Sequence, residues 1–201
     1  MSNFETIKCV VIGDEKVGKT SLIIKSSRKQ FQPEYIPKKA DNYSLLTKFN
    51  SKTIQIGFWD TISNDESNRL RPLSYAKTDI FLVCFSLSSR SSFENVESKW
   101  IPEIKLYSPN VPFILVGTKK DLRANHNFIQ NLKNKNQLIS SKQARKLAKK
   151  LDAFQYIEVS VLSHQNISKV VDETIRSVLY PESKKKKSLR KLNDEKKCSI
   201  L

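Results

Sequence analysis

Glycine and cysteine are both scarce in this chain. Only four of its 201 residues are glycine, and two of these, Gly13 and Gly18, fall close together. Of the three cysteines, Cys9 and Cys84 lie in apolar runs that predict buried strands, and Cys198 lies near the end. Isolated cysteines exclude a disulfide framework and indicate a reducing compartment. No apolar run is long enough to span a membrane, and no signal peptide is expected.

Acidic residues are outnumbered by basic ones, 20 to 36, which gives a net charge of +16. The last 21 residues contribute a net +5 of this charge, and the preceding 180 residues contribute +11. A basic chain suggests nucleic acid as a partner. However, the basic run is confined to the tail and no RNA- or DNA-binding motif is present, so we predict no nucleic-acid partner. We expect one domain over residues 1–180 and a disordered tail over residues 181–201.

Residues 13–20 match the phosphate-binding loop pattern G-x-x-x-x-G-K-[ST] and read Gly13-Asp14-Glu15-Lys16-Val17-Gly18-Lys19-Thr20. Mostly β-branched residues at 7–12 predict a strand before this loop, and the apolar run at 22–24 predicts a helix after it. In that context, backbone N–H groups and the helix N-terminus converge on phosphate oxygens. Lys19 would pair with the β- and γ-phosphates, and the Thr20 hydroxyl would hold Mg²⁺. The alternative is a glycine turn that precedes a helix by chance.

Strands alternate with helices along the chain. Apolar runs at residues 43–49, 53–59, 80–85, 113–116 and 154–159 predict further strands. Helices are predicted at residues 19–28, 93–106, within 124–136, from an N-cap at Ser140 to Lys150, and at 167–179. Residues 31–42 and 60–73 are predicted loops. This order favours an α/β fold with a mostly parallel, six-stranded sheet and helices on both faces, which binds ligands beyond the carboxyl ends of its strands.

Polar motifs follow three of these strands. Asp60 ends a strand as Gly13 does, so the two strand ends can lie side by side, and the carboxylate could reach Mg²⁺ through water. Thr118-Lys119-Lys120-Asp121 ends another strand, and Ser160-Val161-Leu162 ends the last. All three motifs fall at the edge of the sheet where a ligand is expected.

Together these motifs resemble the Ras superfamily of small GTPases, and specifically the Rho/Rac family, over about residues 7–179. The fold implied is a P-loop NTPase small G domain. Besides the Thr-Lys-x-Asp motif, residues 124–136 resemble the insert typical of Rho proteins. The other runs that carry the resemblance are Glu34-Tyr35-Ile36-Pro37, Asp41-Asn42-Tyr43, Arg69-Leu70-Arg71-Pro72-Leu73-Ser74-Tyr75 and Phe93-Glu94-Asn95-Val96.

The resemblance implies a guanine pocket. The Asp121 carboxylate can accept hydrogen bonds from the guanine N1–H and 2-amino groups, a donor pair that adenine lacks. The stem of Lys119 would pack over the base. The implied guanine-binding residues are Phe31, Thr118, Lys119, Asp121, Ser160 and Val161, with the Val161 N–H at O6 and Phe31 covering the other side of the base. The alternative is that Lys119 and Asp121 are ordinary loop charges.

Four positions depart from the family pattern at the γ-phosphate. Glu15 replaces a glycine, crowding the γ-phosphate and the space for a GAP arginine finger. Ser63 replaces a glycine whose N–H contacts the γ-phosphate, and it would join the phosphate-binding residues. Asn64 replaces the glutamine that orients the attacking water, and a misplacement of ~1 Å can cost about 10²-fold in rate. Lys38 replaces a threonine that ligates Mg²⁺. No catalytic residue is therefore intact.

Three functions remain open on these grounds. The chain could be a GTP-binding signalling protein that hydrolyses GTP poorly and stays loaded, like the Rnd-type atypical Rho proteins. It could instead be a working GTPase timer with a compensated site, or a nucleotide-free scaffold. Lys38 could offer its charge to the γ-phosphate, pair with Glu15 or face solvent.

The resemblance implies effectors, an exchange factor and a GDI as partners. The chain itself is expected to be a monomer. The implied effector and switch residues are Tyr35, Lys38, Asp41 and Tyr43. Ala40 replaces a large aromatic residue, so the usual effectors need not carry over. Trp59 and the run from Arg69 to Tyr75 would preserve the exchange-factor and GDI surface.

The chain ends in a C-a-a-X box, Cys198-Ser199-Ile200-Leu201, whose leucine favours geranylgeranylation of Cys198. One lipid chain binds membranes only marginally, so a second signal is expected. The tail supplies it in Lys184, Lys185, Lys186, Lys187, Arg190, Lys191, Lys196 and Lys197. We predict that the protein lies at the cytoplasmic face of anionic membranes, with a second pool in the cytosol. We also expect it to signal to the cytoskeleton or to membrane trafficking. A solvated tail or a nuclear-import patch is the alternative.

Overall fold

A six-stranded sheet forms the centre of the computed structural model, which describes residues 5–27, 42–63, 68–131 and 138–181. The spatial order of the strands is β2-β3-β1-β4-β5-β6, and only β2 runs antiparallel to its neighbour. The strands are β1 (Glu5–Gly13), β2 (Asn42–Phe49), β3 (Lys52–Asp60), β4 (Ile80–Ser86), β5 (Phe113–Thr118) and β6 (Gln155–Glu158). The predicted α/β fold with a mostly parallel sheet is confirmed.

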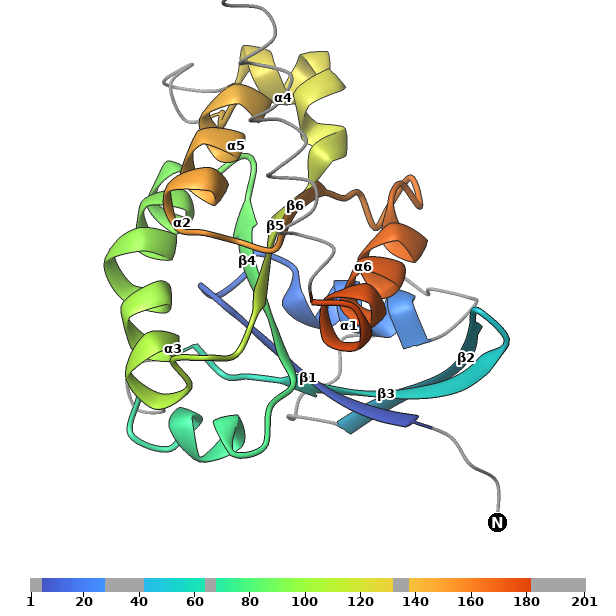
Figure 1. The fold of residues 1–201 in the computed structure, drawn as a ribbon. Coiled ribbons are helices and arrows are strands. Elements are labelled where there is room, and N and C mark those ends of the chain that lie inside the picture. The colour runs from blue at the N-terminus through green and yellow to red at the C-terminus, as the bar shows by residue number, and fades with distance from the viewer. Residues whose placement is uncertain (1–4, 28–41, 64–67, 132–137, 182–201) are drawn as a thin grey trace, which may run out of the picture.

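Helices cover both faces of this sheet (Figure 1). On one face lie α1 (Lys19–Ser27) and α6 (Ile167–Leu179), and on the other lie α2 (Arg90–Asn95), α3 (Ile101–Tyr107) and α5 (Ser141–Lys150). Alternate residues of β1 enter the two cores: Cys9 and Val11 pack with α1 and α6, whereas Val10 and Ile12 pack with α3 and α5. A strand buried on both faces must be almost continuously apolar, as β4 and the second half of β1, residues 9–13, are.

Local sequence signals explain several element ends. Ser140 caps α5 through a capping box, in which its hydroxyl accepts from the Gln143 N–H and the Gln143 side chain accepts from the Ser140 N–H. Asn50 and Ser51 adopt φ angles of 47° and 66° at the turn between β2 and β3. Two left-handed residues give the tight turn that matches the twist of a hairpin. The predicted N-cap at Ser140 is confirmed.

The predicted single helix over residues 93–106 is wrong in its bounds. The segment is α2, a π-helical turn η3 (Val96–Trp100) and α3. Helix α2 begins earlier than predicted because Ser89 caps it, its hydroxyl accepting from the Ser92 N–H. The serine-rich start of α2 has no apolar periodicity, so the pattern could not reveal it. The π turn inserts a residue into the helical repeat before Pro102.

The predicted loop over residues 60–73 is also partly wrong, because the 3-10 helix η2 (Arg71–Tyr75) begins within it. Two short elements follow β5: the 3-10 helix η4 (Lys120–Ala124) and α4 (His126–Gln130), which is the predicted short helix of the insert. The predicted loop at 31–42, apart from its last residue, and most of the tail at 181–201 lie outside the described residues.

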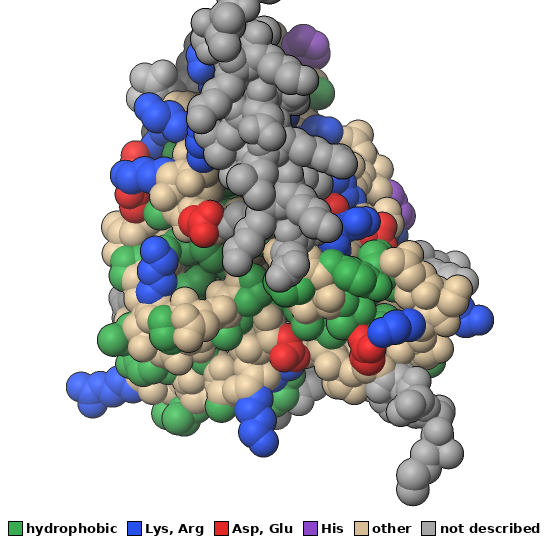
Figure 2. All heavy atoms as spheres, in the orientation of Figure 1, with side chains coloured by type: hydrophobic (Ala, Val, Ile, Leu, Met, Phe, Trp, Pro, Cys, Tyr) green, Lys and Arg blue, Asp and Glu red, His purple; other side chains and the backbone are tan. Residues whose placement is uncertain are grey.

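The surface carries basic side chains at many separate points. On the face shown in Figure 2, Lys and Arg side chains project between apolar areas rather than forming one continuous band. Among the residues that the structure describes, none of the helices has the length and apolar character needed to cross a bilayer.

Candidate functional site

The candidate site lies where the carboxyl ends of parallel strands meet. Strand β1 ends at Gly13 beside β3, whose Asp60 is paired in register with Val11. Strand β5 ends at Thr118, and the chain passes from β6 to Ser160. The predicted convergence of the three motifs at one edge of the sheet is therefore observed.

The loop over residues 13–20 requires glycine at its start. Gly13 has a φ of 141°, and a Cβ atom built there would lie 2.1 Å from the Cys84 carbonyl oxygen. Gly18 has a φ of 101°, and Lys16 between them has a φ of 59°. Residues in left-handed conformations turn successive amides to one side of a loop, which gives a concave anion-binding surface. This surface leads directly into the N-terminus of α1 at Lys19.

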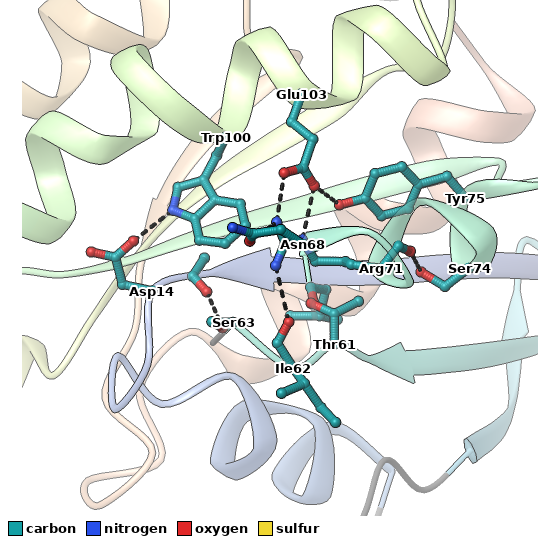
Figure 3. Close-up of polar contacts among 12 residues, drawn as sticks. Asp14, Thr61, Ile62, Ser63, Asn68, Arg71, Ser74, Tyr75, Trp100 and Glu103 are labelled. Carbon is teal, nitrogen blue, oxygen red and sulfur yellow. Dashed lines mark hydrogen bonds and ion pairs between the residues drawn. The ribbon is translucent and has the colours of Figure 1, made fainter. Parts of the chain in front are cut away.

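The Lys19 ammonium is buried in the centre of this loop. It donates to the carbonyl oxygens of Gly13 and Asp14, at 2.9 and 2.8 Å, and to Ser63 Oγ at 2.5 Å. The Ser63 hydroxyl in turn donates to the Gly13 oxygen at 2.6 Å (Figure 3). Burial lowers the pKa of Lys19, and the nearby Asp60 carboxylate opposes that shift. Because three acceptors already surround the ammonium, a phosphate would have to displace at least one of them.

Thr20 and Asp60 form the candidate metal site. The Thr20 hydroxyl donates to Asp60 Oδ2, whereas Asp60 Oδ1 is buried and has no hydrogen-bond partner among the described residues. Burial raises the pKa of Asp60, and the bond from Thr20 and the charge of Lys19 oppose this effect. A hydroxyl and an unpaired carboxylate oxygen are ligands that Mg²⁺ accepts. The residues present therefore fit the predicted Mg²⁺ site.

A hollow of about 210 Å³ lies beside the phosphate-binding loop, and its walls contain most of the predicted guanine-binding residues. The Ser160 hydroxyl donates to Asp121 Oδ1 at 2.5 Å, and the Thr118 hydroxyl donates to the Val17 carbonyl oxygen at 2.5 Å. The first bond fixes the Asp121 carboxylate, and the second joins the end of β5 to the phosphate-binding loop. The lining residues are Val17, Gly18, Ser21, Thr118, Lys119, Asp121, Leu122, Val161 and Leu162.

Lys119 stands at the turn out of β5, with a left-handed φ of 57°. Burial lowers the pKa of Lys119, and the charge of Asp121 opposes that shift. Leu122 and Leu162 add apolar wall that the motif patterns did not indicate. A pocket with apolar walls and one fixed carboxylate suits a flat base that presents hydrogen-bond donors at one edge.

Asp14 anchors the phosphate-binding loop to the neighbouring helices. Its two carboxylate oxygens accept from the Trp100 indole N–H and the Asn95 side-chain amide, each at 2.7 Å (Figure 3 shows the first). Trp100 is completely buried at the end of η3. Sequence reasoning missed this anchor because 86 residues separate Asp14 from Trp100 along the chain.

A second polar cluster holds the segment that follows β3. Arg71 binds Glu103 through two hydrogen bonds of 2.8 and 2.6 Å and donates to the Ile62 carbonyl oxygen at 3.2 Å (Figure 3). The Tyr75 hydroxyl also donates to Glu103. Burial raises the pKa of Glu103, but the bonds from Arg71 and Tyr75 outweigh it, and the net pKa is lowered. The cluster ties η2 and the residues after Asp60 to α3.

Removing the Glu103 charge should destabilise the fold strongly. In Glu103→Gln, the Arg71 side chain, which is 1% exposed, loses its counter-ion, so we expect a loss of about 3 kcal/mol in the free energy of unfolding. The control is Glu97→Gln, because Glu97 pairs with Lys150 at the exposed surface. That change should cost less than about 1 kcal/mol. Denaturant unfolding compares the two variants.

The stability lost in Glu103→Gln should depend on pH. Since folding lowers the pKa of Glu103, the carboxylate stabilises the fold above the ordinary Glu pKa of about 4.3, and this contribution is lost as the pH falls below it. The stability gap between wild type and Glu103→Gln should therefore be large at pH 7 and should shrink at pH 3. An equal gap at both pH values would contradict the assignment.

Several predicted site residues cannot be placed. Phe31, Tyr35, Lys38, Asp41, Asn64 and Cys198 lie outside the described residues. Glu15 is exposed in the phosphate-binding loop. Tyr43, predicted to be a switch residue, is buried against the core that includes α1.

A model of the Ras family matches residues 8–180 of this chain. The matched range contains the phosphate-binding loop, the Thr20 and Asp60 pair, and the pocket around Asp121. The fold is that of a Ras-type small G domain. Members of this family bind guanine nucleotide, usually with Mg²⁺, and act as switches with regulators and effectors. The chain therefore belongs to the Ras family of small GTPases.

Proposed function

We propose that this chain is a Rho-type GTP-binding switch in which GTP hydrolysis is impaired, so that the protein stays largely GTP-loaded at membranes. One contrast carries the proposal. The residues that would hold the nucleotide keep the family's chemistry, whereas the residues that would promote hydrolysis do not. The first group comprises Lys19, Thr20, Asp60, Lys119, Asp121 and Ser160, and the second comprises Glu15, Lys38, Ser63 and Asn64.

The first group would read the nucleotide at three points. Lys19 would exchange an acceptor of its present set for the β- and γ-phosphate oxygens. Asp121 would accept from the guanine edge while Ser160 holds its carboxylate in place. Thr20 and, through water, Asp60 would hold Mg²⁺, which neutralises phosphate charge when bound. Apart from the bond of Lys19 to Ser63, these contacts do not involve the altered positions, so binding can persist where hydrolysis does not.

Two described residues support the loss of hydrolysis. Glu15 places an exposed carboxylate in the loop that would face the γ-phosphate. This carboxylate would repel the γ-phosphate and would occupy the space that an arginine finger needs. Ser63 is committed to Lys19 and to Gly13 by short hydrogen bonds, which a glycine could not make. At positions 38 and 64 the sequence alone supports the proposal, because an ammonium cannot ligate Mg²⁺ and asparagine is one methylene shorter than glutamine.

The Rho assignment rests on the sequence runs given above, and one of them, residues 69–75, lies in a part of the surface with exposed apolar side chains. Leu70 and Leu73 are 66% and 74% exposed, and Trp59 on β3 is 36% exposed. Exposed apolar residues beside a nucleotide site are typical of a surface for partner proteins. We assign this surface to the binding of an exchange factor and a GDI. The effectors would bind elsewhere on the chain, which we propose to be a monomer.

Nucleotide binding is tested by removing any bound nucleotide from the full-length chain, restoring Mg²⁺, titrating with a fluorescent GTP analogue and competing with unlabelled GTP or ATP. The proposal requires saturable binding, competition by GTP and a loss of affinity when Mg²⁺ is chelated. No binding at all would favour the nucleotide-free scaffold, and equal competition by ATP would refute the guanine pocket.

The membrane proposal makes its own prediction. Cys198→Ser should move the protein from membranes to the cytosol without a change in nucleotide affinity, because the lipid site is remote from the G domain in sequence. Replacing Lys184, Lys185, Lys186 and Lys187 by glutamine should weaken binding to anionic vesicles, and more at low salt than at high salt. Sedimentation with membranes measures both effects. Continued pelleting of Cys198→Ser would place the anchor elsewhere.

A further inference from the structure

A second hollow, of about 400 Å³, lies at the opposite end of α1 from the phosphate-binding loop. Helices α1 and α6 contact each other, and α1 also contacts β2 (Figure 1). The hollow lies among these three elements and the His164 loop. Lys19 begins α1 and Lys25 is in its last turn, about 9 Å further along the helix axis. The lining residues are Lys25, Ser26, Ser27, Leu45, Thr47, His164, Ile167, Ser168, Val171 and Asp172.

The hollow contains a buried cation that has no counter-ion among the described residues. Lys25 is only 8% exposed, and no carboxylate of the described residues lies within ion-pair distance of its ammonium. Its one polar contact within the described chain is His164 Nε2, at 3.3 Å. This contact is to a neutral or cationic ring and supplies no negative charge. A lysine this deeply buried is normally paired.

The helix dipole does not replace the missing counter-ion. The negative end of the α1 dipole compensates Lys25 only in part, since it is equivalent to about half an elementary charge. A buried ammonium that lines a hollow is satisfied by an anionic group bound there.

We infer that this hollow is a second binding site, which takes a small aliphatic carboxylate. Lys25 would bind the carboxylate, while Leu45, Ile167 and Val171 would contact the aliphatic part. A monoanion fits better than a dianion because the exposed Asp172 carboxylate also lines the hollow and would repel a second negative charge. The inference is independent of the function proposed for the guanine pocket.

The test is an NMR titration of the ¹⁵N-labelled full chain with sodium hexanoate, hexanamide and inorganic phosphate. Hexanoate should shift the backbone amides of residues 25–27, 45–47 and 167–172 in a saturable manner. Hexanamide has nearly the same shape but no charge, so it should bind at least about ten-fold more weakly. Phosphate should also bind more weakly than hexanoate. Shifts that do not saturate or that lie elsewhere, and equal binding of hexanamide or phosphate, would each overturn the assignment.

Two variants separate the site from general electrostatics. Lys25→Met should weaken hexanoate binding at least about ten-fold, whereas Lys48→Met, which removes an exposed charge from β2 outside the hollow, should leave it unchanged. Ser168→Phe fills the hollow from an exposed position and should abolish binding without removing a core contact. If Lys25→Met does not fold, Ser168→Phe decides the question: loss of binding supports the site, and unchanged binding overturns it.

Discussion

Single-turnover GTP hydrolysis by this chain should be at least about 10²-fold slower than that of a Rho protein with the family's glycine and glutamine, given what a misplaced water costs. Addition of a RhoGAP should change the rate little. Glu15 lies in the loop where an arginine finger would have to enter, and Ser63 is held against Lys19 and Gly13. Rapid-quench measurement of phosphate release gives both rates. Acceleration by orders of magnitude with RhoGAP would contradict the proposal.

Restoring the family residues should recover part of the activity. Glu15→Gly with Asn64→Gln should raise the rate more than the product of the two single effects, because residues that act on one transition state are not additive. Adding Ser63→Gly should raise it further by releasing Lys19 from one of its three acceptors. If either single change alone restored the full rate, the four departures would not act as a unit.

Asp121→Ala should abolish the preference for GTP over ATP, with a loss of at least about 10²-fold in GTP affinity. The variant loses the acceptor that Ser160 holds in place, while the bonds of Lys19 and Thr20 at the phosphate end remain. Competition binding with GTP and ATP measures the preference. A large remaining preference for GTP would show that the base binds elsewhere.

Asp121→Asn provides the matched comparison, because it keeps the size of the side chain and replaces the charged carboxylate by a neutral amide. The Asn side-chain amide can donate a hydrogen bond to a base that has an oxygen in place of the 2-amino group. The variant should therefore bind xanthosine triphosphate in preference to GTP. Lys120→Ala tests for nonspecific damage, since the neighbouring Lys120 does not line the pocket. It should leave the preference for GTP intact.

The alternation of strands with helices and the edge of the sheet that holds the site were predictable because each rests on a local pattern. The loop at Gly13 and Gly18 follows an apolar strand, and parallel strands bring their carboxyl ends together. The clash of a Cβ at Gly13 with the Cys84 carbonyl supplies the structural reason for that glycine. The N-cap at Ser140 is equally local, and it lies at the predicted residue.

The contacts that support the site were not predictable from sequence, because they join residues far apart in the chain. Asp14 meets Trp100, Arg71 meets Glu103, and Ser63 meets Lys19. The π turn at Val96–Trp100 shifts the helical repeat, and no apolar periodicity marks such a shift. The predicted role of Ser63 involved only its backbone. In the structure its side-chain hydroxyl accepts from the Lys19 ammonium and donates to the Gly13 carbonyl oxygen, both in the phosphate-binding loop.

The nucleotide that copurifies with the full-length chain tests the central proposal most directly. The protein is purified in Mg²⁺ buffer and denatured, and the released nucleotide is identified by ion-exchange chromatography and quantified against protein. A switch that binds GTP but hydrolyses it poorly should release mostly GTP, close to one per chain. Release of GDP would show a working GTPase timer, and the absence of nucleotide would show a scaffold; either result contradicts the proposal.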